Sequence, residues 1–76
     1  MSEVRGLTHR ELQVLQLICE GLSTKQIALE LGITFKTAVT HRTHLLEKAG
    51  VHDSVSLFRW ALRQGLINLE GGGANL

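Results

Sequence analysis

The sequence predicts an all-α domain, a four-helix bundle that contains a helix-turn-helix. Four segments repeat apolar residues at helical spacing, no segment alternates as a half-buried strand does, and the chain contains no proline. The second and third segments are separated by only three residues that include a glycine, which is typical of a helix-turn-helix. With 76 residues, the chain is long enough for one small domain. The predicted helices cover about residues 8–20, 24–31, 35–49 and 54–64.

The first predicted helix, residues 8–20, has clear signals at both ends. Thr8 is a favourable N-cap, and Glu11 three positions later completes a capping box, in which each side chain bonds the other residue's backbone N–H. Gly21 ends the helix, because glycine readily adopts the left-handed conformation that follows a helix C-terminus. The stripe that we expect to face the core consists of Leu12, Val14, Leu15, Ile18 and Cys19.

The second predicted helix, residues 24–31, leads into the helix-turn-helix. Ser23 caps the helix, and Gln26 stands at the capping-box position. Ala28 is small, which lets the third helix cross the second closely. The side that we expect to be buried consists of Ile27, Ala28 and Leu31, and the turn that follows consists of Gly32, Ile33 and Thr34.

The third predicted helix, residues 35–49, has two unlike faces. The face expected to be buried carries Ala38, His41, Leu45, Leu46 and Ala49. The opposite face carries Lys36, Thr40, Thr43 and Glu47, with Val39 beside them. β-Branched residues lose side-chain freedom in a helix, so a helix that had only to be soluble would carry other residues there. Hydroxyls and methyls suit the major groove of DNA, because they bond base edges and contact the thymine methyl group.

We assign roles along this face because recognition helices read bases mainly with their N-terminal residues. The predicted base contacts are Val39, Thr40 and Thr43. The predicted phosphate contacts lie at the margins of the third helix and at helix starts, where free N–H groups attract anions: Lys25, Thr34, Lys36, Thr37, His41, Arg42 and Lys48. Each assignment has a plainer alternative. Lys25 and Arg42 are also compatible with solvated surface charges, and His41 with an ordinary half-buried histidine.

The fourth predicted helix, residues 54–64, carries more apolar surface than one small core needs. Its core-facing side is expected to hold Val55, Leu57, Phe58, Ala61 and Leu62. Trp60 extends this arc, and it can either lie flat on its own domain or contact a second copy across a two-fold axis. We predict a dimer on DNA with Trp60 and Leu57 in the interface. The small area predicts a monomer or weak dimer off DNA.

Composition and charge narrow the setting of the protein. The one cysteine, Cys19, excludes an internal disulfide and fits a reducing compartment. The sequence contains neither a signal peptide nor an apolar run near the roughly 20 residues that span a bilayer, so we expect a cytoplasmic protein without membrane contact. The net charge of +1 says little alone, but residues 33–50 carry +2 and residues 1–32 carry −1. Positive charge therefore gathers around the third helix.

Four stretches of the sequence are distinctive in combination: LTHRELQVL, GLSTKQIALELGI, KTAVTHR and ALRQGLI. With them, residues 7–67 closely resemble the LuxR/NarL (GerE-type) DNA-binding domain of bacterial transcription regulators. The resemblance implies sequence-specific binding of double-stranded DNA in transcription regulation, with the recognition helix in the major groove. It also implies dimerisation through the fourth helix, and RNA polymerase is a candidate partner of such a regulator.

The sequence departs from the family pattern at three positions. His9 stands where proline is usual, Ala38 where valine is usual, and Val39 where lysine is frequent. The missing lysine removes a polar groove contact, so the operator sequence does not carry over from relatives. Many relatives carry an upstream regulatory domain, so we interpret residues 1–6 as a linker or N-terminal extension, in either a cut-out domain or a short stand-alone regulator. Residues 68–76 are expected to form a flexible tail.

Other classes of function have less support. A zinc site would need His41 and His44 plus further ligands, and Cys19 lies on a core stripe, so we predict neither a metal nor a cofactor. The sequence offers no paired carboxylates, catalytic triad order or phosphate-binding glycine loop, so we predict no enzyme. The alternative to DNA binding is a protein-interaction module on a helix-turn-helix scaffold, because a fold does not fix a function. The low net charge favours this alternative, and the basic segment 33–50 opposes it.

Overall fold

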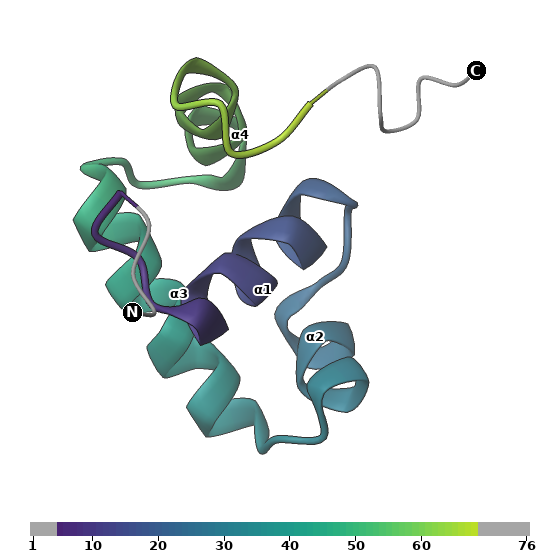
Figure 1. Ribbon diagram of the computed structural model, residues 1–76. Helices are drawn as coiled ribbons and strands as arrows, with labels where there is room; N and C mark the ends of the chain where they lie inside the picture. The colour runs from purple at the N-terminus through teal and green to yellow at the C-terminus, as the bar shows by residue number, and fades with distance from the viewer. Residues whose placement is uncertain (1–4, 69–76) are drawn as a thin grey trace.

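The computed structural model describes residues 5–68 of the chain (Figure 1). Its regular elements are the helices α1 (His9–Cys19), α2 (Thr24–Leu31), α3 (Phe35–Ala49) and α4 (Ser54–Arg63). The predicted all-α class is confirmed, and each predicted helix end lies within one residue of the observed one. The predicted tail, apart from Asn68, and the first four residues of the predicted N-terminal extension lie outside the described residues.

The other helices pack around α3, the longest of the four. α1 and α2 each lie against α3, and α4 rests on α1 and α3. In Figure 1, α3 runs down one side of the molecule and meets α2 at the bottom. The core between them consists of Leu7, Val14, Leu15, Ile18, Ile27, Leu45, Leu46, Leu57 and Ala61. Because α3 makes these contacts with one face, its opposite face is exposed.

The first two helices begin with the predicted capping boxes. At α1, Thr8 Oγ1 accepts a hydrogen bond from the Glu11 N–H at 3.1 Å, and Glu11 Oε1 accepts one from the Thr8 N–H at 2.9 Å. At α2, Ser23 Oγ accepts from the Gln26 N–H at 3.1 Å, and Gln26 Oε1 accepts from the Ser23 N–H at 2.8 Å. Each box satisfies two N–H groups that a helix start or its cap would otherwise leave without a partner.

The last two helices are capped by single side chains. Thr34 is the N-cap of α3, and its Oγ1 accepts a hydrogen bond from the Thr37 N–H at 3.1 Å. At α4, Asp53 Oδ1 accepts one from the Ser56 N–H at 2.8 Å, a cap that the sequence analysis did not identify. A cap of this kind contributes about 1 kcal/mol to stability.

The turn between α2 and α3 depends on Gly32. This residue has a φ of +68°, in the left-handed region that costs other L-residues strain. The Ile33 N–H then donates to the carbonyl oxygen of Ala28 at 3.0 Å, which closes the end of α2 and reverses the chain. Two residues later α3 begins, and Ala28 is buried beneath it. The predicted helix-turn-helix is therefore present.

One prediction for α4 is wrong. The sequence pattern places Val55 on the core-facing side, but the residue is 64% exposed. The helix starts at Ser54 outside the core and reaches it only at Leu57, which is 0% exposed, and then at Ala61. Trp60 is half-buried and packs against the core of its own chain.

An ion pair joins the beginning of α1 to the end of α3. Lys48 Nζ donates to Glu11 Oε1 at 2.8 Å, and Glu11 is only 4% exposed. Burial alone would raise the pKa of Glu11, but the hydrogen bonds from Lys48 and from the Thr8 N–H outweigh it and hold the pKa below its ordinary value. The Glu11 carboxylate is therefore charged at neutral pH, and it belongs both to a capping box and to a contact between two helices.

We expect Glu11→Gln to lower the free energy of unfolding at pH 7 by about 1–3 kcal/mol, because Lys48 loses its charged partner. The depressed pKa adds a pH dependence. The stability that comes from the Glu11 charge is present above the unfolded-state pKa of about 4.5 and is lost as the pH falls through the lower folded-state value. Urea unfolding followed by circular dichroism, at pH 7 and in the acidic range, measures both effects.

The exposed Glu30 offers a matched control for this experiment. Glu30→Gln removes the same charge from α2 and should leave both the stability at pH 7 and its acid dependence close to those of the parent. Equal acid slopes for the parent and Glu11→Gln would contradict the assignment of this pH dependence to Glu11.

Candidate nucleic-acid interface

The two faces of α3 are separated as the sequence predicts. Ala38, Leu45 and Leu46 are buried, and His41 and Ala49 are half-buried beside them. The exposed side chains of α3 include all three predicted base contacts and several predicted phosphate contacts: Lys36, Thr37, Val39, Thr40 and Thr43. They therefore share the face that α3 turns away from the other helices.

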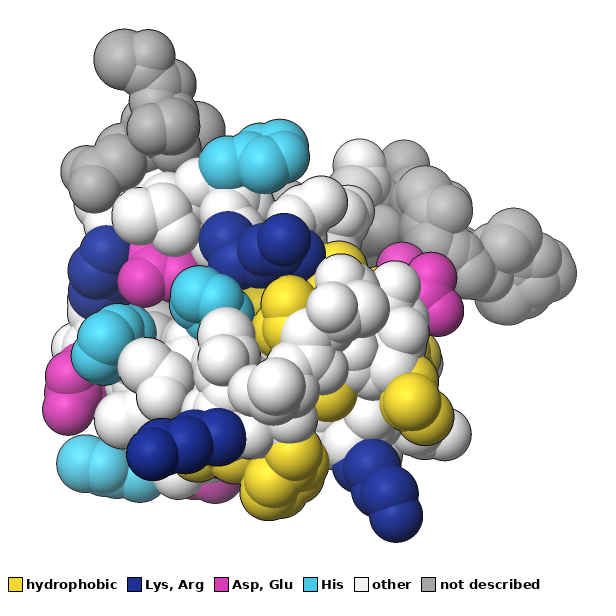
Figure 2. Space-filling view, turned by 90° about the horizontal axis from the view of Figure 1, so that it is seen from below, with side chains coloured by type: hydrophobic (Ala, Val, Ile, Leu, Met, Phe, Trp, Pro, Cys, Tyr) yellow, Lys and Arg dark blue, Asp and Glu magenta, His cyan; other side chains and the backbone are white. Residues whose placement is uncertain are grey.

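Figure 2 shows the end of the molecule where α2 and α3 meet. Lys and Arg side chains are spread around this end, His side chains gather on one side of it, and hydrophobic side chains are exposed among them, while some Asp and Glu side chains are also visible. Such a mixture of positive charge and apolar surface can approach both the phosphates and the base edges of a nucleic acid.

Three cations of this region differ in their exposure and in their partners within the protein. Lys25 in the first turn of α2 and Lys36 in the first turn of α3 are exposed, and neither has an acidic partner among residues 5–68. Arg42 is half-buried, and its Nη2 donates to Ser54 Oγ at 3.3 Å. This bond ties α3 to the start of α4, yet it uses only one of the five N–H groups of the guanidinium.

The predicted phosphate contacts Thr34 and Lys48 are engaged inside the protein. The Thr34 hydroxyl donates to Thr37 Oγ1 at 2.9 Å while its oxygen accepts the Thr37 N–H. Lys48, in the last turn of α3, donates to Glu11 of α1. The hydroxyl proton of Thr37 is left available, because its oxygen acts here as an acceptor.

The two predicted base-reading threonines differ in their hydrogen bonds. The Thr40 hydroxyl donates to the carbonyl oxygen of Lys36, four residues back in the same helix, at 3.1 Å. Thr43 is exposed, and its hydroxyl has no hydrogen-bond partner among residues 5–68. Thr43 can therefore donate to an external acceptor without giving up an internal bond, whereas Thr40 cannot.

Phe35 is not among the predicted contacts, yet it is 57% exposed at the first position of α3. It lies four residues before Val39, which is 38% exposed, so the two share one row of the helix. One sequence signal could have identified Phe35. A side chain in the first turn of a helix has no preceding turn of that helix to cover it, even when its angular position lies near the core.

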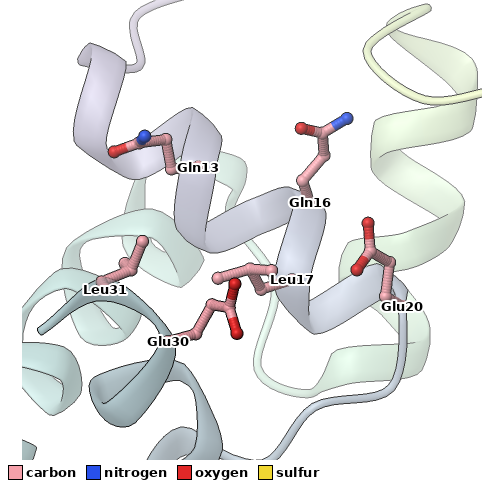
Figure 3. Close-up of a pocket in the computed structure, with 6 residues that line it drawn as sticks. All are labelled: Gln13, Gln16, Leu17, Glu20, Glu30 and Leu31. Carbon is pink, nitrogen blue, oxygen red and sulfur yellow. The ribbon is translucent and has the colours of Figure 1, made fainter.

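A shallow hollow of about 190 Å³ lies between α1 and α2, and no residue of α3 lines it (Figure 3). Two glutamates, Glu20 and Glu30, stand at it together with two glutamines and two leucines. Carboxylates repel phosphate. This hollow is therefore separate from the basic surface of α2 and α3 and is unsuited to nucleic acid.

Among residues 5–68, no three His, Cys, Asp or Glu side chains gather as a metal site would require. In the same part of the chain, no helix has the length and apolar character to cross a membrane. Neither finding adds a residue to the surface formed by α2 and α3.

Comparison with known proteins identifies the family. The family profile described as "Bacterial regulatory proteins, luxR family" matches residues 5–61, from just before α1 into α4. The chain belongs to the LuxR family of bacterial regulatory proteins. Its α2 and α3 are the helix-turn-helix of a LuxR-family domain, a class that binds DNA in transcription regulation.

Three full-length relatives are similar to this LuxR-family chain. The uncharacterized response regulatory protein YgeK of Escherichia coli is 41% identical over 90% of this chain and 46% of its own length. The transcriptional regulatory protein MctR of Rhizobium johnstonii is 46% identical over 86% of this chain and 30% of its own length. The transcriptional regulatory protein LiaR of Bacillus subtilis is 47% identical, over 83% and 30% respectively. The chain thus spans less than half the length of each of these relatives.

Proposed function

We propose that this domain binds double-stranded DNA in a sequence-specific manner, with α3 in the major groove, and so regulates bacterial transcription. The observation that carries the proposal is the exposed face of α3, where methyl and hydroxyl groups lie near cations that have no acidic partner among residues 5–68. A helix that follows a tight glycine turn and presents such a face fits the width of the major groove, about 12 Å. The cytoplasm, where bacterial DNA lies, is the setting, and RNA polymerase is a further proposed partner.

Within this proposal, Val39, Thr40 and Thr43 contact bases. The proposed phosphate contacts are Lys25, Lys36, Thr37, His41 and Arg42. Thr34 and Lys48 are left out of this set, because the Thr34 hydroxyl caps α3 and the Lys48 ammonium is held by Glu11.

We further propose that two copies pair through α4 on adjacent half-sites, in a dimer that is weak off DNA. Leu57 cannot belong to this interface, because its side chain is fully buried in its own chain. Trp60 has part of its surface exposed, and Val55 is the more exposed apolar side chain of the helix. An interface of α4 with its copy would therefore use Val55, Trp60 or both.

A protein-interaction module on the same scaffold is the alternative function. The net charge of +1 favours it, since many DNA-binding domains are far more basic. A salt titration with nonspecific duplex separates the two, because direct phosphate contacts make log affinity fall steeply with log salt concentration. Affinity that does not respond to salt would support the protein module.

We expect Lys25→Ala to weaken binding to all duplexes alike and to make the salt slope shallower by about 1, because one phosphate contact is lost. Arg42→Ala should act in the same way, with an added loss of stability from its bond to Ser54. Fluorescence anisotropy at several salt concentrations measures the slope. Arg63→Ala, which removes a charge from the last turn of α4, serves as the control and should leave the slope unchanged. A loss confined to one operator variant would mean that Lys25 reads a base.

We expect Thr43→Ala to reduce the difference in binding free energy between specific and nonspecific DNA by about 1 kcal/mol, because an exposed hydroxyl that can bond a base edge is lost. The specific DNA site is first selected by the protein from a pool of random duplexes. Fluorescence anisotropy then gives the affinity for this site and for nonspecific DNA. Nonspecific affinity should stay at the parent value. An unchanged difference after substitution of each of Val39, Thr40 and Thr43 would contradict the proposed base-reading surface.

We expect the parent to bind cooperatively to a duplex with two half-sites about one helical turn apart. Val55→Ser should reduce this cooperativity and keep the affinity for a single half-site, because Val55 adds nothing to the core. Trp60→Ala is measured beside it, with a thermal unfolding control, since Trp60 also packs on its own core. If both variants bind as cooperatively as the parent, α4 does not form the interface. If the parent itself shows no cooperativity at any half-site spacing, the proposed dimer on DNA is wrong.

A further inference from the structure

We infer that α3 selects its half-site through the 5-methyl groups of thymine, which it contacts with the γ-methyl of Thr40, the side chain of Val39 and the ring of Phe35. This inference rests on the proposed function, since it concerns how the same surface discriminates among DNA sequences. It is carried by the hydrogen bond that the Thr40 hydroxyl makes and by the exposure of its apolar neighbours.

The hydrogen bond of Thr40 limits what this residue can read. Its hydroxyl proton goes to the carbonyl oxygen of Lys36 at 3.1 Å, so Thr40 cannot also donate to the acceptors of guanine or to thymine O4. Two features are left to this exposed side chain, an oxygen lone pair and the γ-methyl group. Among the base edges of the major groove, the thymine methyl is the apolar group that such a methyl can contact.

The neighbours of Thr40 on one side extend this apolar surface. Val39 is 38% exposed and Phe35 is 57% exposed, and both side chains lack polar atoms. They stand four residues apart, so they lie one above the other along α3. Water covers Val39 and Phe35 in the free protein, and it is favourable to replace this water by contact with methyl groups. If these side chains covered a polar base edge instead, the base would lose its hydrogen-bond partner.

The polar side chains of this face also favour a half-site that contains thymine. The usual reader of guanine is an Arg or Lys that bonds N7 and O6 with two N–H groups, and Val39, Thr40 and Thr43 offer no such group. Lys36 is the exposed cation nearest to them in sequence, in the first turn of α3. Thr43, whose hydroxyl has no partner in the described part of the chain, is left as the residue of the three that can donate a hydrogen bond to a base. The expected half-site therefore contains at least one thymine opposite the first two turns of α3.

The test replaces thymine by uracil, one position at a time, in the duplex selected from random sequences. This change removes one methyl group and keeps every hydrogen-bonding group of the base. We expect one or more positions at which the affinity falls about fourfold, the value for one buried methyl-sized group, with the salt slope unchanged.

Two substitutions of Thr40 assign the contact to its methyl group. Thr40→Ser removes the methyl and keeps the hydroxyl, and Thr40→Val keeps the methyl and replaces the hydroxyl by a second methyl. We expect Thr40→Val to keep the preference for thymine over uracil and Thr40→Ser to lose it at one position. Both changes are on an exposed position, and circular dichroism verifies that each variant is folded.

The outcomes separate this inference from the proposed function. Specific, salt-dependent binding in which every uracil substitution changes affinity less than twofold would overturn the inference and leave the function standing. The reverse behaviour of the two variants, with serine keeping the preference and valine losing it, would show that the hydroxyl reads the base and would also overturn it. The absence of salt-dependent binding to any duplex would overturn both.

Discussion

The buried carboxylate of Glu11 links the start of α1 to the end of α3. It accepts the Thr8 N–H at the start of α1 and the Lys48 ammonium near the end of α3, so one side chain fixes a helix start and a helix-to-helix contact. The Glu11 side chain is 5% exposed and that of Lys48 is 36% exposed, so removal of Lys48 would leave a buried carboxylate without its cation, which is costly. The tilt of α3, and with it the direction of its exposed face, is therefore tied to α1.

α3 has to be stable as a helix although its exposed face carries β-branched residues. An exposed face of threonine and valine lowers helix propensity, because β-branched side chains lose rotamer freedom in a helix. The structure offsets this at both ends and along the inner face: the Thr34 cap at the start, the left-handed Gly50 at the end, and the buried Ala38, Leu45 and Leu46. The bond from Thr40 to the Lys36 carbonyl adds local order to the exposed face. The unfavourable residues are thus tolerated because the helix does not depend on them for its stability.

Most of the fold could be predicted from the sequence because its signals are local. A capping threonine acts within three residues, a terminal glycine acts within five, and helical periodicity alone separates the two faces of α3. The pairing of Glu11 with Lys48 joins residues 37 positions apart, and the capping box already accounts for Glu11, so no local pattern indicates it. The exposure of Val55 depends on where α4 crosses the core, which periodicity does not specify. For a related reason the exposed face of α3 could be predicted, but the bonds that the Thr34 and Thr40 hydroxyls donate could not, because they depend on side-chain rotamers.

The low net charge has a structural explanation that bears on how the domain would hold DNA. Glu11 neutralises Lys48, while Glu20 and Glu30 line the hollow between α1 and α2, away from α3. Glu47 is the exception, an exposed carboxylate on α3, but it lies beyond Arg42 toward the C-terminal end of the helix, and the cations proposed for phosphate, Lys25, Lys36 and Arg42, all precede it. Three such contacts give a salt slope of roughly −3, well below that of proteins with 6–10 contacts. One copy would hold DNA weakly, and two copies on adjacent half-sites would double the number of contacts, so the small charge of this domain itself favours binding as a pair.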